Sequence, residues 1–197
     1  MATTEPSQPD QFYAKDRKTG REWLEKHHTG TKNIRLIIYH KKSGTPSIKY
    51  DEAVEEALCF GWIDAKPNTR DDESYYLLFA RCNPTSNWSR ANRERAKRMI
   101  RQGLMTEAGM EMIALAKKNG TWTALEDIQK SVVPSDLKEE FAASPAAEKN
   151  FSAFPPSSKR IILEWILNAK QPQTRKKRIE ETVQLEENNI RANHYRQ

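Results

Sequence analysis

The sequence has few of the residues that form metal centres, disulfide frameworks and phosphate-binding loops. It contains two cysteines, Cys59 and Cys82, and four histidines, and their spacing resembles no zinc site. Its seven glycines lie mostly at expected turns and helix ends, so they form no glycine-rich phosphate loop. We therefore expect no metal, no cofactor and two reduced thiols.

Long apolar runs are also missing. No stretch approaches the roughly 18 apolar residues that a helix needs to cross a membrane, so we expect no transmembrane segment. The first residues, MATTEPSQPDQ, have neither the basic start nor the apolar stretch of a secretory signal. These absences predict a cytoplasmic protein.

Charge is what the sequence has in excess. Charged residues make up 30% of the 197 residues and hydrophobic residues 37%. The formal net charge is +6 and the pI is near 9.3. The apolar residues recur in periodic clusters, which suits a folded core. A positive balance favours anionic partners such as nucleic acid, acidic proteins or anionic lipid.

The N-terminal part of the chain alternates between helical and strand patterns. We expect three strands, over residues 33–41, 62–66 and 74–82, the last two joined by a long polar loop. We expect four helices, over residues 16–28, 51–61, 86–103 and 106–120. Asp51 is the expected N-cap of the second helix, and Gly61 is its expected C′ residue.

The C-terminal part is expected to be helical, with helices over residues 157–170 and 174–188. The whole is an α+β protein, in which a small antiparallel sheet is packed with helices and followed by a helical C-terminal region. The expected segments are a disordered N-terminus (1–10), an α+β core domain (11–120), a linker with short helices (121–157) and a C-terminal helical region (158–197).

The strand expected over residues 62–66 carries the first candidate site. Trp62, Asp64 and Lys66 would share one face, which places an aromatic ring, an acid and a base in a row. Arg81 of the partner strand could pair with Asp64 if the register puts both on one side. The structural alternative is that Asp64 pairs with a neighbouring cation or caps a turn, while Trp62 covers the sheet.

The start of the helix expected over residues 86–103 could complete that site. Four of its residues could converge on the Trp62–Asp64 face and line a polar cleft: Ser86, Trp88, Ser89 and Asn92. An asparagine on a core-facing side must find hydrogen-bond partners. The alternative is that Ser89 is the N-cap and Asn92 satisfies nearby backbone groups.

The same helix has a basic face that could bind nucleic acid. Its candidate phosphate contacts are Arg90, Arg95, Lys97, Arg98 and Arg101, with Trp88 or Tyr75 as stacking partners. The alternative is a face that water simply solvates, because no recognition motif accompanies it. A second basic cluster, residues 174–178, begins a helix, where the dipole disfavours cations. Its position suggests an acidic partner elsewhere in the chain.

Five stretches together resemble the YdeI/OmpD-associated family, whose members are called bacteriocin-protection proteins. They are WLEKHH, LIIYHKKSGTPSIKYDEAVEEALCFGWIDAK, NWSRAN, GLMTEAGMEMIALAKKNGTW and AKQPQTRKKRIEETV. The resemblance runs from about Phe12 to about Leu185. The usual PRK before the family's Ser-x-Trp-Ser element is here ARCNPTSNWS, which keeps Arg81 but not the next basic residue.

The resemblance implies resistance to bacteriocins or cationic antimicrobial peptides, and some family descriptions place members in the periplasm. A chain with a net charge of +6 repels a cationic peptide, so we expect protection to act indirectly, from inside the cell. The resemblance brings no catalytic residues with it.

A non-enzymatic binding protein is therefore favoured over an enzyme, with an unidentified small molecule or an acidic protein as partner. Asp64 would accept hydrogen bonds from a cationic or polar ligand group, Lys66 and Arg81 would hold an anionic part, and the tryptophans would form apolar walls. Two alternatives stay open: a nucleic-acid-associated basic protein, and an enzyme with Asp64 as general base.

Overall fold

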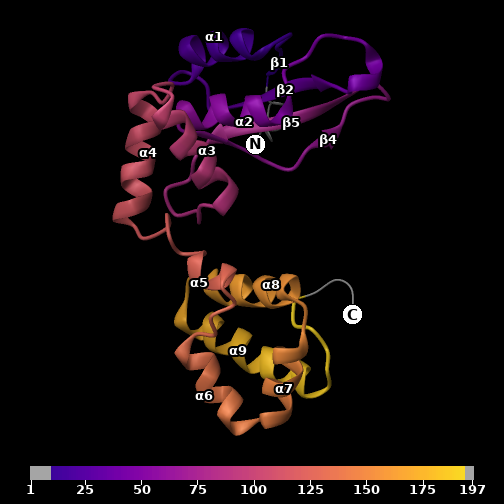
Figure 1. Ribbon diagram of the computed structural model, residues 1–197, viewed down its shortest axis with the longest axis vertical. Helices are drawn as coiled ribbons and strands as arrows, with labels where there is room; N and C mark the ends of the chain where they lie inside the picture. Colours follow the sequence, from indigo (N-terminus) through magenta and orange to yellow (C-terminus); the bar gives the residue numbers. More distant parts are fainter. Residues whose placement is uncertain (1–9, 194–197) are drawn as a thin grey trace, which may run out of the picture. The chain divides into compact units, whose positions relative to one another are not determined.

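The structure, a computed structural model, describes residues 10–193 and divides the chain into two compact units. The first unit is residues 1–123 and the second is residues 124–197 (Figure 1). The segment expected to be disordered, 1–10, lies outside the described residues except for Asp10. The carbonyl of Asp10 accepts a hydrogen bond from the Arg35 N–H at 2.9 Å.

The first unit contains strands and helices in alternation. Its described strands are β1 (Gln11–Tyr13), β2 (Asn33–Tyr39), β3 (Trp62–Asp64), β4 (Asn68–Thr69) and β5 (Ser74–Arg81). Its described helices are α1 (Arg17–His27), the short 3-10 helix η1 (Lys41–Ser43), α2 (Tyr50–Cys59), α3 (Arg90–Arg101) and α4 (Glu107–Lys118). The α+β class is therefore confirmed.

The strands form one small mixed sheet in the order β1-β2-β5-β3, with β4 also paired to β5. β3 and β5 are antiparallel, as predicted, with Trp62 opposite Arg81 and Asp64 opposite Phe79. β1 was too short to be detected in the sequence, and it pairs with β2 in parallel. The parallel pair arises because α1 crosses over between the two strands. The sheet is thus mostly, but not wholly, antiparallel.

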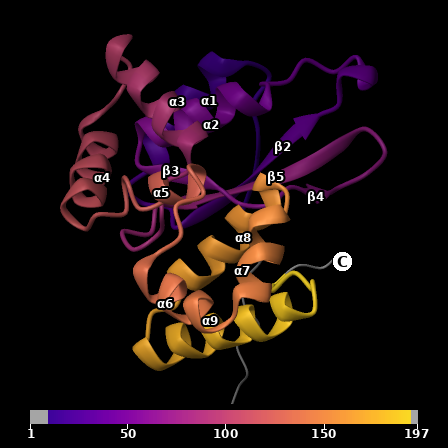
Figure 2. The same ribbon diagram turned by 60° about the horizontal axis from the view of Figure 1, so that its bottom comes forward.

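One face of the sheet is covered by helices (Figure 2). Leu36 of β2 and Leu77 of β5 join Leu24 of α1 and Val54 of α2 in one buried cluster. Lys49 is the N-cap of α2, and Asp51 lies inside the first turn of the helix. The prediction that Asp51 is the N-cap was therefore wrong. α2 therefore starts directly after the loop that follows β2.

Gly109 marks the place where α4 crosses the end of α2. A Cβ atom at Gly109 would approach the backbone carbonyl oxygen of Cys59 and lie 2.8 Å from that of Leu58. Alanine normally favours a helix over glycine by about 1 kcal/mol. Here the clash is with backbone atoms, so we expect Gly109→Ala to lower the free energy of unfolding of the first unit by about 2 kcal/mol in urea titrations.

Gly20 in α1 offers the matched control for that substitution. A Cβ atom there would lie 2.9 Å from Ile48 Cδ1, the end of a side chain that can rotate away. We expect Gly20→Ala to stay within about 1 kcal/mol of the unaltered protein. Equal stability of the Gly109→Ala and Gly20→Ala chains would contradict the close contact between α4 and α2.

The second unit is helical throughout its described elements. They are α5 (Glu126–Gln129), α6 (Ser135–Ala143), α7 (Pro145–Ala153), α8 (Pro156–Leu167) and α9 (Pro172–Glu187). Most of residues 124–157, expected as part of a linker, pack into its core through Leu137, Phe141 and Phe151. Composition was misleading because Pro145 and Pro156 stand in the first turn of helices, where proline is well tolerated.

Candidate functional site

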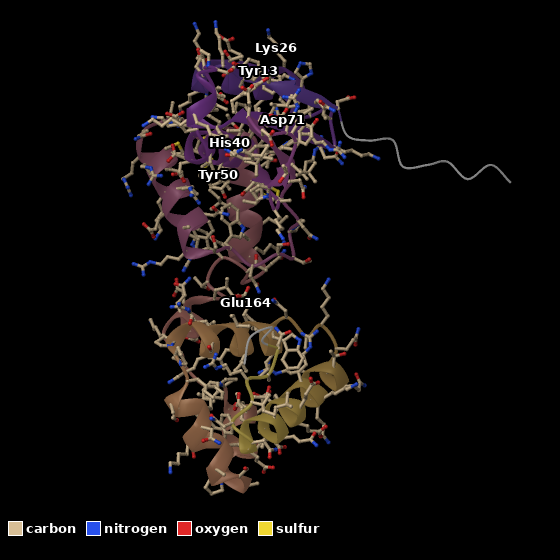
Figure 3. All side chains as sticks on the ribbon, turned by 90° about the vertical axis from the view of Figure 1, so that its right-hand side faces the viewer. Tyr13, Lys26, His40, Tyr50, Asp71 and Glu164 are labelled. Carbon is tan, nitrogen blue, oxygen red and sulfur yellow. The ribbon has the colours of Figure 1, made fainter. Side chains whose placement is uncertain are left out.

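A hollow of about 540 Å³ opens in the first unit where β2 ends and α2 begins. The end of β2, the loop of residues 40–49, the start of α2 and Tyr75 of β5 line it. Figure 3 shows two of the lining residues, His40 and Tyr50, close together on one side of the first unit. The volume is within the range of about 300–1,000 Å³ that small-molecule sites occupy.

Backbone hydrogen bonds hold both ends of the loop of residues 40–49. The His40 N–H donates to the Glu73 carbonyl at 2.7 Å, and the Ile48 N–H donates to the Ala14 carbonyl at 3.1 Å. Between these ends the chain turns at Gly44, whose φ of +72° is a left-handed conformation that glycine adopts without strain. The wall of the hollow is therefore anchored to the sheet at two points.

Tyr50 connects the hollow to Asp64. Its hydroxyl donates a hydrogen bond to Asp64 Oδ2 at 2.6 Å. Burial and the Asp64 carboxylate raise the pKa of Tyr50 to about 12, so the phenol is a protonated donor at neutral pH. The Arg95 guanidinium lies over the Tyr50 ring, 5.9 Å from its centroid, and pairs with Asp51 at 2.5 Å. Tyr50 is thus held by groups from β3 and α3.

Three basic side chains line the hollow: His40, Lys41 and Lys49. Within residues 10–193, neither lysine forms an ion pair. The start of α2 adds backbone N–H groups and the positive end of the helix dipole. Glu52 accepts a hydrogen bond from the Lys49 N–H at 3.1 Å, which satisfies the first of these donors. The remaining field in the hollow favours an anion.

Tyr75 contributes a ring and a hydroxyl. Its ring lies 5.4 Å from that of His40, measured between centroids, with an angle of 38° between the ring planes. In the described part of the chain, the Tyr75 hydroxyl has no hydrogen-bond partner. Burial raises the pKa of this phenol as well, so it stays protonated. A ligand in the hollow can therefore receive or donate a hydrogen bond there.

The Trp62 end of the predicted face is separate from the hollow of about 540 Å³. There, Trp62 and Arg81 line another hollow, of about 380 Å³, together with residues of α4. Trp62 is 1% exposed, and its Nε1 donates to the His28 carbonyl at 3.3 Å. Arg81 stands opposite Trp62 in the register, and its guanidinium donates to the same carbonyl at 3.2 Å. Both side chains therefore secure the end of α1, and the pairing of Arg81 with Asp64 is not formed.

Of that predicted row, Asp64 alone is connected to the hollow of about 540 Å³, through its hydrogen bond with Tyr50. The alternative role for Asp64 was a structural one, in which it pairs with a neighbouring cation or caps a turn. Asp64 does have a structural partner, but this is the Tyr50 hydroxyl and not a cation. Lys66 is exposed and lies beyond the end of β3. The predicted row of ring, acid and base therefore does not form one site, because Trp62 is buried, Asp64 is bonded to Tyr50 and Lys66 is exposed.

The residues predicted from the start of α3 lie elsewhere. A second hollow, of about 50 Å³, is lined by Ser86, Trp88 and Asn92 together with Ile63. Ile63 alternates with Asp64 along β3, so the two side chains point to opposite faces of the strand. The convergence of these α3 residues on the Trp62–Asp64 face is therefore not found.

Ser89 caps the helix and does not line a cleft, as the alternative prediction proposed. Its hydroxyl accepts a hydrogen bond from the Asn92 N–H at 3.2 Å, which makes it the N-cap of α3. The Asn92 side-chain oxygen in turn accepts from Arg95 Nη1 at 2.9 Å. Trp88 is 8% exposed and packs against Trp122, with the ring centroids 5.0 Å apart. These side chains build the fold of the first unit.

Most of the basic face of α3 is engaged with acids of the same chain. Three of the five predicted cations form ion pairs: Arg95 with Asp51 at 2.5 Å, Lys97 with Glu94 at 2.9 Å, and Arg98 with Glu55. Arg90 and Arg101 are exposed. A nucleic acid would therefore have to compete with existing carboxylates along most of this face.

The basic cluster of residues 174–178 has the acidic partner that its position suggested. Arg175 donates to both carboxylate oxygens of Asp136, at 2.6 and 2.9 Å. The Arg175 guanidinium holds the pKa of Asp136 below its usual value. This contact joins the start of α9 to the start of α6 within the second unit.

A network of ion pairs joins α1 to α2 and α3. Glu56 of α2 binds Arg17 at 2.6 Å and Arg21 at 2.7 Å. Arg17 also pairs with Glu55 at 2.9 Å, and Glu55 with Arg98 of α3. Glu55 and Glu56 are both buried, so their charges depend on these arginines.

The thiols are poor nucleophiles at neutral pH. Burial raises the pKa of Cys59 to about 11 and that of Cys82 to about 12. Among residues 10–193, no group of three or more His, Cys, Asp or Glu side chains is placed to hold a metal ion. No helix in the same range is both long and apolar enough to cross a membrane.

The sequence analysis missed the basic lining of the hollow. The stretch HKKSGTPSIKY (40–50) contains His40, Lys41 and Lys49 between a clear strand and a clear helix. A loop that leads into a helix N-terminus is a known place for anions, so this order of residues was a usable signal. Tyr75 was named only as a possible stacking partner for nucleic acid. Its position beside His40 could not have been predicted, because it depends on strand pairing.

The two units match two different family models. Residues 12–112 match a family described as a domain of unknown function, DUF8412. Residues 130–189 match a family described as "Bacteriocin-protection, YdeI or OmpD-Associated". The resemblance to the second family, expected from about Phe12 to Leu185, is therefore found in the second unit. No curated protein and no solved structure matches the chain.

Proposed function

The chain belongs to the DUF8412 family, and we propose that it is a non-enzymatic binding protein that takes a small anionic ligand in the hollow beside Tyr50. One observation carries the proposal: His40, Lys41 and Lys49 line a hollow of about 540 Å³, and neither lysine has a counter-charge in the described chain. Side chains that already have partners need no ligand, whereas converging unpaired cations favour one.

The second unit supports a link to bacteriocin protection. Its match to the family described by that name covers residues 130–189. The net charge of +6 argues against direct capture of a cationic peptide, because like charges repel. We therefore propose that ligand binding in the first unit regulates a protective activity that acts indirectly, in the cytoplasm.

Catalysis by Asp64 is less well supported than binding. Asp64 Oδ2 already accepts a hydrogen bond from the Tyr50 hydroxyl at 2.6 Å, which leaves only Oδ1 to take a proton from a substrate. Tyr50 cannot replace it as a base at neutral pH, because its phenol stays protonated. The pair instead orients the Tyr50 ring at the edge of the hollow.

The test reverses the charge of the two lysines. We expect inorganic phosphate to shift the backbone amide signals of residues 40–52 in ¹⁵N NMR spectra of the full chain. Lys41→Glu combined with Lys49→Glu should weaken this binding at least tenfold, on the order of 1 kcal/mol per charge. The fold should survive, because a carboxylate at position 49 suits the start of α2.

Lys42 provides the matched control, because it is exposed in the same 3-10 helix and does not line the hollow. Lys42→Glu should weaken phosphate binding much less than Lys41→Glu alone. An equal loss of affinity in these two single variants would mean that only the overall charge of the protein matters. Phosphate shifts that avoid residues 40–52 altogether would remove the proposed site.

A further inference from the structure

We infer that the anion bound in the hollow is a mononucleotide, with its base against Tyr75 and His40 and its phosphate against Lys41, Lys49 and the start of α2. This inference rests on the proposed function and adds the class of ligand. It comes from the division of the hollow into an aromatic and apolar part and a basic part.

The aromatic part has a floor of buried aliphatic side chains. Ile38 is 3% exposed and Ile48 is 1% exposed, and both line the hollow. Tyr75 stands opposite Ile38 in the β2–β5 register, so the two side chains share the helix-covered face of the sheet. With the His40 ring 5.4 Å from the Tyr75 ring, this part offers apolar surface and π-faces. A flat heterocycle fits such surroundings by stacking.

The basic part is suited to a phosphate. Lys41 and Lys49 come from the two ends of the loop, on η1 and immediately before α2, so both chain segments bring positive charge to one hollow. The positive end of the α2 dipole lies beside Lys49. The acids nearby, Asp51, Glu52 and Asp64, are already bound by Arg95, by the Lys49 N–H and by the Tyr50 hydroxyl, in that order.

A phosphate by itself, or a nucleoside by itself, would contact only one of the two parts of the hollow. Free inorganic phosphate makes no use of the Tyr75 and His40 rings. A nucleoside without phosphate leaves Lys41 and Lys49 without a counter-charge. The hydroxyls of Thr45 and Tyr75 line the space and have no partner in residues 10–193, so they are available to the ribose and the base.

The experiment compares ligands that carry one half or both. The unaltered chain is titrated by NMR with the four ribonucleoside 5′-monophosphates, with adenosine and with inorganic phosphate. We expect at least one monophosphate to bind about tenfold or more tightly than phosphate, which is the usual gain from stacking one base. We expect it to exceed adenosine by a similar factor, because adenosine lacks the charge.

Variants of Tyr75 locate the base. Tyr75→Ala should reduce the affinity for the monophosphate to nearly that for phosphate and leave phosphate binding unchanged, whereas Tyr75→Phe should keep most of the affinity. Tyr76→Ala is the control, since Tyr76 follows Tyr75 on the opposite face of β5 and does not line the hollow. An equal effect of Tyr75→Ala and Tyr76→Ala would overturn the placement of the base.

The outcomes separate this inference from the proposed function. If phosphate shifts residues 40–52 but no monophosphate binds more tightly, the hollow is an anion site and the mononucleotide is overturned. If adenosine binds as tightly as its monophosphate, the assignment of the phosphate to Lys41 and Lys49 is overturned. If neither phosphate nor any monophosphate shifts these residues, both proposals fail together.

Discussion

Replacing Glu56 by alanine is expected to lower the free energy of unfolding of the first unit by about 3 kcal/mol. Glu56 is 2% exposed, and its two oxygens bind Arg17 at 2.6 Å and Arg21 at 2.7 Å. Without the carboxylate, two guanidinium groups face a buried surface with no counter-charge at that position. The side chains of Arg17 and Arg21 are 34% and 25% exposed, so water limits the loss.

The measurement is urea unfolding of the full chain followed by circular dichroism. Glu22→Ala is the matched control, because Glu22 pairs with Lys18 on the exposed side of α1 at 3.8 Å. That exposed pair should contribute less than about 0.5 kcal/mol. If both variants lose the same small amount, the Glu56 pairs do not hold α1 on α2.

The second unit is expected to lose stability as the pH rises from 5 to 8, because of Glu186 in α9. Glu186 is fully buried, and neither of its carboxylate oxygens has a hydrogen-bond partner among the described residues. The backbone carbonyl of Glu186 accepts hydrogen bonds from Asn150 Nδ2 at 2.8 Å and from the Asn189 N–H at 2.9 Å. Burial raises the pKa of this carboxyl from 4.5 to about 8.

The direction of the effect follows from proton binding. The folded unit keeps the Glu186 proton up to about pH 8, whereas the unfolded chain releases it near pH 4.5. The stabilisation by the proton is therefore complete below pH 4.5 and is lost as the pH rises toward 8. At about 1.4 kcal/mol for each pH unit, the loss between pH 5 and pH 7 is about 3 kcal/mol.

Glu186→Gln removes the titrating group while keeping its shape. We expect the stability of this variant to change little between pH 5 and 8, and to exceed that of the unaltered unit at the upper end. Trp165 is the only tryptophan in residues 124–197, so its ¹⁹F signal in fluorotryptophan-labelled protein reports on this unit. Glu180→Gln on the exposed side of α9 should keep the pH dependence. If the stability of Glu186→Gln still falls as the pH rises, the pH dependence comes from another titrating group.

Local patterns in the sequence predicted most elements of the first unit. The alternation along 33–41 and 74–82 predicted β2 and β5, each to within two residues of its observed end. Ser89 is the N-cap of α3, as one of the two alternatives proposed. Gly61, with a φ of +73°, follows α2 in the expected left-handed conformation. Such features arise within one or two turns of backbone, so neighbouring residues suffice to predict them.

The candidate site could not be assembled in the same way. Asp64 bonds to Tyr50 and not to Arg81, because the register places Phe79 opposite Asp64. Arg98 looked like a solvated cation, yet it meets Glu55 on another helix. Both pairings depend on how elements dock, and a side chain carries no local mark of its distant partner.

The sequence by itself determined the α+β class, the positive charge and the positions of most helices and strands, because periodicity and capping act over a few residues. Only the tertiary structure decided that Trp62 is core, that the cations of α3 are mostly paired, and that His40, Lys41 and Lys49 surround a hollow with Tyr75. Those outcomes depend on strand register and on the docking of α2 against the sheet, which join residues far apart in the chain.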